Sequence, residues 1–186
     1  MKFLLSFFFF IIFASQANAS HLLGGEMYYD YLGSNNYKVT IILFRDCNAT
    51  SGFDNQLHYT IFDEDQMSPN YSVFLSASRV VTNLPVDYSN PCVVPPPGLC
   101  VDQAVYIDTV NLPTNIAGYS FSFQRCCWAA NIINVVNPDD FGLTLSCFLP
   151  GTNQLPTGFN NAARFLNLPP LVLCSQNELD FDHSAI

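Results

Sequence analysis

The chain has 186 residues, and its six Lys and Arg residues against fifteen Asp and Glu residues give a net charge of −9 at pH 7. An acidic surface repels phosphate backbones and anionic membranes, and no basic cluster lies among the aromatic residues, which argues against nucleic-acid binding. A chain of this length buries a sizeable core unaided, so its seven cysteines add to a core and do not replace one.

The first 19 residues have the pattern of a secretory signal peptide. They combine a positive charge at Lys2, an apolar run over residues 3–13 and the cleavage pattern Ala17-Asn18-Ala19. The apolar run is well short of the ~20 residues that a membrane-spanning helix needs, and no second such run follows. We therefore expect residues 1–19 to be removed, the mature chain to begin near Ser20 outside the cytoplasm, and no membrane insertion after cleavage.

The rest of the chain is predicted to be almost entirely β-strand. Residues 25–47 predict a hairpin, because an aromatic-rich run and a β-branched run flank the turn residues 33–36. Clusters of Pro, Gly, Asn and Asp separate further apolar runs as turns. Those runs predict strands at residues 58–63, 71–75, 104–110, 119–127, 132–136 and 141–149. Short strands at this spacing predict an all-β fold, an antiparallel β-sandwich of immunoglobulin-like architecture.

Two of the predicted strands end in the same pattern, in which Arg and then Cys follow the apolar positions of one face. Arg45 and Cys47 end one strand, and Arg125 and Cys127 end the other. Because side chains alternate between the faces of a strand, we expect Cys126 and Cys127 to point in opposite directions and to need two different partners. Cys127 shares the core-facing parity of Cys47, so a Cys47–Cys127 disulfide is the preferred long-range pair.

The remaining cysteines are assigned by proximity and elimination. Cys92 and Cys100 bracket the short segment "VVPPPGL" and are expected to pair with each other. Cys126 would then meet Cys174, although six cysteines allow 15 connectivities. Cys147 is left over, either as a small buried hydrophobe or as a free thiol.

No pattern in the chain predicts catalytic, cofactor-binding or metal-binding residues. Zinc sites need repeated CxxC or Cys/His spacings that do not occur, and "RCCW" is not the CxxC motif of a thioredoxin-like centre. The motifs GxSxG and HExxH, Walker-type loops and dinucleotide-binding glycine patterns are absent too. A thiol-dependent enzyme or redox protein stays open as a less favoured hypothesis, because distant Cys and His residues can meet in a fold.

One acidic cluster and one aromatic set have alternative interpretations. Asp63, Glu64 and Asp65 could ligate calcium, but they lack the alternating DxDxDG arrangement, and an acidic hairpin tip is the preferred interpretation. An exposed aromatic platform could stack sugars, although aromatic residues in strands more often belong to a core. This carbohydrate-binding alternative would use Trp128 with Tyr28, Tyr29 and Tyr31.

Four segments of the chain together resemble a known family. They are "SHLLGGEMYYDYLGSNNYKVTIILFRDCN", "NPCVVPPPGLCVDQAVYIDTVNLP", "GYSFSFQRCCWAANIINVVNP" and "FNNAARFLNLPPLVLCSQNELDFDHSA". In this order they are similar to the N-terminal region of large secreted surface proteins of gliding-type bacteria. Those proteins continue into PKD-like repeats and end in a gliding-motility-associated C-terminal domain used by type IX secretion.

The resemblance implies an extracellular β-rich module with an adhesive or structural role and no catalytic function. Its pattern covers Cys47, Cys92, Cys100, Cys126, Cys127 and Cys174, which is consistent with three disulfides, whereas Cys147 and Trp128 depart from it. It also implies a module over residues 20–174, with residues 175–186 as the start of a truncated following domain or a tail. The implied partners are an extracellular protein or glycan and other domains of a longer parent. The implied location is the cell surface or the medium, or the periplasm for a fragment that lacks the sorting domain.

Overall fold

The computed structural model describes residues 22–65, 68–75, 79–86, 93–155, 157, 159–173, 178 and 180–186, with the backbone alone for 68–75. The predicted signal peptide, Cys92 and Cys174 lie outside the described residues. Within the described ranges, no helix is both long and apolar enough to cross a membrane.

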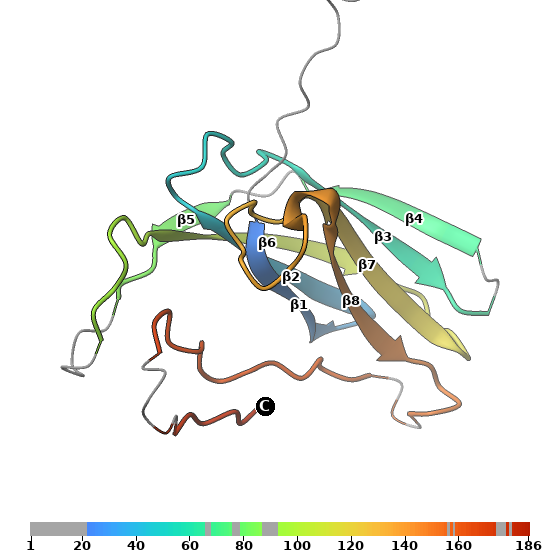
Figure 1. Ribbon diagram of the computed structural model, residues 1–186. Helices are drawn as coiled ribbons and strands as arrows, with labels where there is room; N and C mark the ends of the chain where they lie inside the picture. The colour runs from blue at the N-terminus through green and yellow to red at the C-terminus, as the bar shows by residue number, and fades with distance from the viewer. Residues whose placement is uncertain are drawn as a thin grey trace, which may run out of the picture.

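The described residues form two four-stranded antiparallel sheets, which pack as a β-sandwich (Figure 1). Sheet A has the strand order β1-β2-β6-β5, and sheet B has the order β4-β3-β7-β8. The strands are β1 (Leu22–Gly33), β2 (Asn36–Asp46), β3 (Leu57–Asp63), β4 (Ser68–Leu75), β5 (Val80–Asn83), β6 (Val101–Asn111), β7 (Gly118–Cys126) and β8 (Gly142–Pro150), with a 3-10 turn η1 (Pro138–Asp140) before β8.

This strand order is that of an immunoglobulin-like sandwich. Strands β1, β2, β6 and β5 take the places of A, B, E and D in the ABED sheet. Strands β3, β7 and β8 take the places of C, F and G in the facing sheet, and β4 adds a strand beside C. The predicted fold class is therefore confirmed.

The predicted N-terminal hairpin is also confirmed. Strands β1 and β2 pair antiparallel around Ser34 and Asn35, whose φ angles are 51° and 62°. Positive φ at both central residues is what a two-residue type I′ turn requires, because its twist matches that of the flanking strands. The Asn36 side chain donates a hydrogen bond to the Gly33 carbonyl at 3.2 Å and closes the turn.

The core lies between the two sheets and is rich in aromatic rings. Its fully buried members come from alternate positions of β1, β2, β3, β6 and β7, as the period of a strand requires. The Tyr29 ring of sheet A stacks on the Phe121 ring of sheet B, with centroids 5.6 Å apart. The Tyr29 hydroxyl also donates a hydrogen bond to the Phe148 carbonyl at 3.0 Å. One side chain therefore connects the two sheets through both ring packing and a hydrogen bond.

One strand prediction was wrong, and one strand was not predicted. Residues 132–136 form turns and bends, with Ile133 99% exposed, because β7 and β8 already pair along their whole length and residues 127–141 only connect them. The prediction also missed β5, whose four residues pair with the edge of β6. So short a strand carries too little alternation to be recognised in a sequence.

Candidate functional site

Cys47 and Cys100 form a disulfide within sheet A. Their Cα atoms are 5.4 Å apart, and the Cys47 N–H donates to the Cys100 carbonyl at 3.2 Å. The pairing follows from register, because Asp46 of β2 lies opposite Val101 of β6 and each cysteine is the next residue beyond that pair. The predicted pairs Cys47–Cys127 and Cys92–Cys100 were therefore wrong, since neither anticipated that β2 and β6 are neighbours.

Cys126 and Cys127 form a disulfide with each other. The prediction of opposite directions and separate partners was wrong, and with it the pairing of Cys126 with Cys174. The alternation of β7 stops at Cys126, because the chain then leaves sheet B for sheet A. There the Cys127 carbonyl accepts a hydrogen bond from the Leu22 N–H, and the Ala129 N–H donates to the Leu22 carbonyl.

Cys147 carries a free thiol on the core side of β8. It lies opposite Phe121 in the register of β7 and β8 and packs against the core as a partly buried side chain. Burial raises the pKa of the thiol to about 12, so the thiolate that a nucleophile requires is scarce at neutral pH. This argues against the thiol-dependent enzyme hypothesis for this residue.

We expect Cys147 in the native protein to resist alkylation. At pH 9 an unfolded cysteine is about half ionised, whereas the native thiol stays protonated, so its reaction with iodoacetamide should be at least about 100-fold slower in native protein than in denatured protein. Peptide mapping by mass spectrometry locates the label on Cys147, and Cys147→Ser provides the blank. Equal rates in native and denatured protein would contradict the burial of the thiol.

The acidic cluster holds a loop in place. Asp63 accepts hydrogen bonds from the Asn115 side chain at 2.7 Å and from the Asp65 N–H at 2.9 Å. Asp65 accepts one from the Ile116 N–H at 3.2 Å. These carboxylates fasten the turn after β3 to the segment that leads into β7, which accords with the hairpin-tip interpretation.

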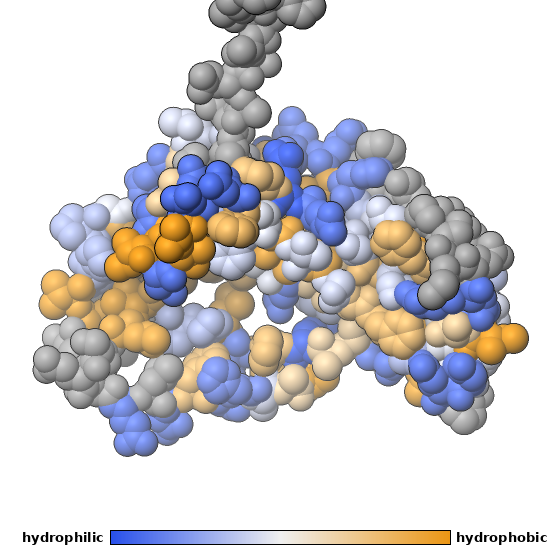
Figure 2. All heavy atoms as spheres, turned by 45° about the vertical axis from the view of Figure 1, so that its right-hand side comes forward, coloured by the Kyte–Doolittle hydropathy of each residue, from blue (hydrophilic) through white to orange (hydrophobic). Residues whose placement is uncertain are grey.

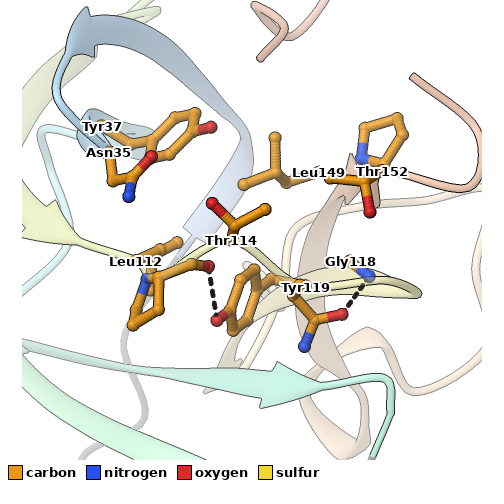
Figure 3. Close-up of a pocket in the computed structure, with 11 residues that line it drawn as sticks. Asn35, Tyr37, Leu112, Thr114, Gly118, Tyr119, Leu149 and Thr152 are labelled. Carbon is orange, nitrogen blue, oxygen red and sulfur yellow. Dashed lines mark hydrogen bonds between the residues drawn. The ribbon is translucent and has the colours of Figure 1, made fainter. Parts of the chain in front are cut away.

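A pocket of about 20 Å³ beside this loop is the environment of a buried tyrosine (Figure 3). The Tyr119 hydroxyl at the start of β7 donates a hydrogen bond to the Pro113 carbonyl at 2.9 Å. The Gly118 N–H donates to the Asn115 side-chain oxygen at 2.6 Å. A tyrosine at the start of strand F that bonds to the backbone a few residues upstream is the tyrosine corner of immunoglobulin-like sandwiches. The pocket has room for about one water molecule, so we assign it a structural role.

Removing the Tyr119 hydroxyl should weaken this corner. Tyr119→Phe leaves the Pro113 carbonyl without its hydrogen-bond donor, and we expect the free energy of unfolding to fall by about 1–3 kcal/mol. Urea unfolding followed by circular dichroism measures the change. Tyr28→Phe is the matched control, because the Tyr28 hydroxyl has no hydrogen bond among the described residues and its ring lies under the Arg164 guanidinium. Equal losses in the two variants would contradict the assignment.

Three arginines are used to hold the loop between β2 and β3. Arg45 donates a hydrogen bond to the Ser51 carbonyl of this loop and forms a salt bridge with Asp102 of β6 at 3.1 Å. Arg125 forms a salt bridge with Asp54 of the loop at 3.0 Å. Arg79 donates a hydrogen bond to a backbone carbonyl of the same loop. These cations therefore stabilise one end of the sandwich and are not displayed as an anion-binding surface.

The four aromatic residues of the predicted sugar platform do not form one exposed surface. Tyr29 is fully buried in the core, and Trp128 packs against that core. The Tyr28 ring lies beneath Arg164, and the Tyr31 ring stacks on Phe159 with centroids 4.8 Å apart.

An apolar groove of about 610 Å³ lies between sheet A and residues 168–171. Residues of β1, β2 and β6 line one side of the groove, including Leu23, Phe44 and Val101. The other side belongs to the segment after β8, which is tied to β1 by an Arg164–Asp30 salt bridge at 2.6 Å. Figure 1 shows this segment running below sheet A, and Figure 2 shows gaps between the lower rim of the molecule and its body.

A second surface is the outer face of sheet B, formed by the residues of β3, β7 and β8 that point away from the core. The burial of these strands alternates, which assigns their outward positions. Register aligns these positions in rows that cross the three strands. One row is Thr60, Ser122 and Ser146, and the next is Phe62, Ser120 and Phe148.

The described outward positions of β3, β7 and β8 share a composition without acidic, Lys or Arg side chains. His58, Gln124 and Thr144 are three further outward positions, and none of these nine described positions is Asp, Glu, Lys or Arg. The sequence already contained this signal, because Ser120, Ser122 and Gln124 alternate with the aromatic core positions of "GYSFSFQ". Our interpretation of the sequence used only the aromatic half of that alternation and missed the polar half.

Comparisons of the chain with protein-family models, with curated proteins and with solved structures found no match. The resemblance drawn from the sequence motifs therefore stays a prediction, and arguments about function rest on the geometry of this chain.

Proposed function

We propose that this chain is an exported, non-catalytic module of a cell-surface, adhesin-like protein of the kind associated with gliding motility. The signal-peptide pattern of residues 1–19 supports export, and the immunoglobulin-like sandwich suits a module that presents surfaces to partners. The similarity of its motifs to secreted surface proteins of gliding-type bacteria supports the same proposal. Type IX secretion would then be the route of the longer parent protein.

The observation that carries the proposal is that the reactive side chains of the described residues have structural roles. Described cysteines are either bonded in disulfides or, at Cys147, partly buried with a raised pKa. Asp63 and Asp65 bind the segment that leads into β7. Arg45 and Arg125 bind the loop between β2 and β3. What the molecule offers to a partner is surface, namely the groove beside sheet A and the outer face of sheet B.

The proposed partner is an extracellular protein or a glycan, with other domains of a longer parent as covalent neighbours. Binding would be by surface complementarity. The proposed location is the cell surface or the medium.

Expression of the tagged chain in a gliding bacterium tests the proposal. We expect the chain to be recovered outside the cytoplasm with residues 1–19 removed, which N-terminal sequencing detects. A chain without residues 1–19 is the control and should stay inside the cell. Recovery of the full chain in the cytoplasm with its leader intact would contradict the proposal.

A further inference from the structure

We propose that the outer face of sheet B binds an uncharged polysaccharide. This inference rests on the proposed function, because it names the class of partner that the exported module would meet outside the cell. Its basis is the row pattern of hydroxyl and aromatic side chains on three neighbouring strands.

The hydroxyl row gives this face a regular set of hydrogen-bonding groups. Thr60, Ser122 and Ser146 lie opposite one another in register on β3, β7 and β8. Neighbouring strands are about 4.8 Å apart, so the row presents a hydroxyl at each step across the sheet. A hydroxyl both donates and accepts, which suits a ligand whose own surface consists of hydroxyls.

The aromatic row supplies apolar faces beside these hydroxyls. Phe62 and Phe148 flank Ser120, and with one strand between them they lie about 10 Å apart. Phe148 is 41% exposed although it is a large apolar residue in a regular strand. The exposed Phe148 ring can pack against the apolar face of a sugar ring, with the partly buried Phe62 ring two strands away, while the hydroxyl row binds sugar edges.

The absence of Asp, Glu, Lys and Arg at these nine positions selects the kind of ligand. The chain has a net charge of −9, yet His58 is the one nitrogen base among these positions and no carboxylate, ammonium or guanidinium group lies among them, so the two central rows have no charged side chain to pair with a phosphate, a sulfate or a uronic acid. Protein interfaces are enriched in Arg, Met and aromatic residues and depleted in Ser. A face built mainly of Ser and Thr therefore favours a neutral glycan over a second protein.

Native affinity gel electrophoresis tests the inference on the exported chain. The probes are soluble neutral polysaccharides, namely hydroxyethylcellulose, xylan, mannan and a β-1,3-glucan, with alginate as the anionic probe. We expect at least one neutral polysaccharide to retard the protein and alginate to have no effect. Phe148→Ala should weaken that retardation about tenfold or more, and Ser146→Asp should weaken it similarly by placing a charge in the hydroxyl row.

Phe165→Ala is the matched control, because Phe165 is an exposed phenylalanine in the C-terminal segment, where it bridges to Ala185 and follows Arg164, which pairs with Asp30 of sheet A. It should bind as the unmodified protein does, and circular dichroism of all variants reports whether they fold. No retardation by any neutral polysaccharide, retardation by alginate alone, or equal binding by the Phe148→Ala and Phe165→Ala variants would overturn the inference. Self-association that Ser146→Asp abolishes would also overturn it, because the face would then join two copies of the chain. Export is measured separately, so an exported chain that fails these tests removes the inference and leaves the proposed function standing.

Discussion

Replacing Cys47 and Cys100 together with alanine is expected to lower the free energy of unfolding by about 4 kcal/mol. The two residues are 53 positions apart, so their disulfide closes a long loop and restricts the unfolded chain. The folded state should persist, because β2 and β6 stay paired over their whole length. Urea or guanidinium unfolding of the double variant, followed by circular dichroism, measures the loss.

The Cys126–Cys127 disulfide provides a control for this result. It joins adjacent residues, so it closes no chain loop, and replacing both by alanine should lower the free energy of unfolding far less. Equal losses in the two double variants would contradict the loop-closure account. A loss below about 1 kcal/mol from the Cys47 and Cys100 double variant would also contradict it. The unfolded chain would then be restricted by something other than this disulfide.

The strands were predictable because alternation is a local property. Along β2, Tyr37, Val39, Ile41 and Leu43 share one face, and all four are buried in the core. The hairpin turn was also local, since Ser34 and Asn35 lie between two strong strands. Strand existence and the sandwich class could therefore be predicted from sequence.

The disulfides could not be predicted, because pairing depends on which strands become neighbours. Nothing local to Cys47 indicates that β6, more than 50 residues later, lies beside β2. The predicted direction of the Cys127 side chain was wrong for a related reason, because side chains alternate between faces only while the chain stays in one sheet. The hydrogen bonds of Cys127 and Ala129 with Leu22 mark the change of sheet, and they belong to the tertiary structure alone.

The candidate site was partly visible in the sequence. The polar half of the β7 alternation was readable at Ser120 and Ser122, but its meaning depended on Ser146 and Phe148, which only register places beside it. The tyrosine corner was likewise visible as Tyr119 six residues after Pro113. Recognising it required knowing that β7 takes the place of strand F.

Gly118→Ala is expected to lower the free energy of unfolding by about 3 kcal/mol or more. Gly118 has a φ of +100°, which side-chain-bearing residues rarely adopt. A Cβ added there would lie 2.2 Å from the Leu149 carbonyl oxygen and 2.7 Å from the Gly151 nitrogen. Both are backbone atoms and cannot turn away, so β7 and β8 would have to separate where they begin their ladder.

Gly98→Ala separates the steric part of this effect from the conformational part. Gly98 also has a positive φ, +79°, but no atom lies within 4 Å of an added Cβ, so only the backbone conformation should contribute, at about 1 kcal/mol. Chemical unfolding of both variants measures the difference. Equal losses of unfolding free energy would mean that the backbone around Gly118 shifts to accommodate the added methyl group. A larger loss at Gly118 has a wider consequence, because the Gly118 carbonyl also accepts from the Glu64 N–H and its N–H donates to Asn115. Moving this one residue would therefore disturb the tyrosine corner, the turn after β3 and the register that aligns the rows on the outer face of sheet B.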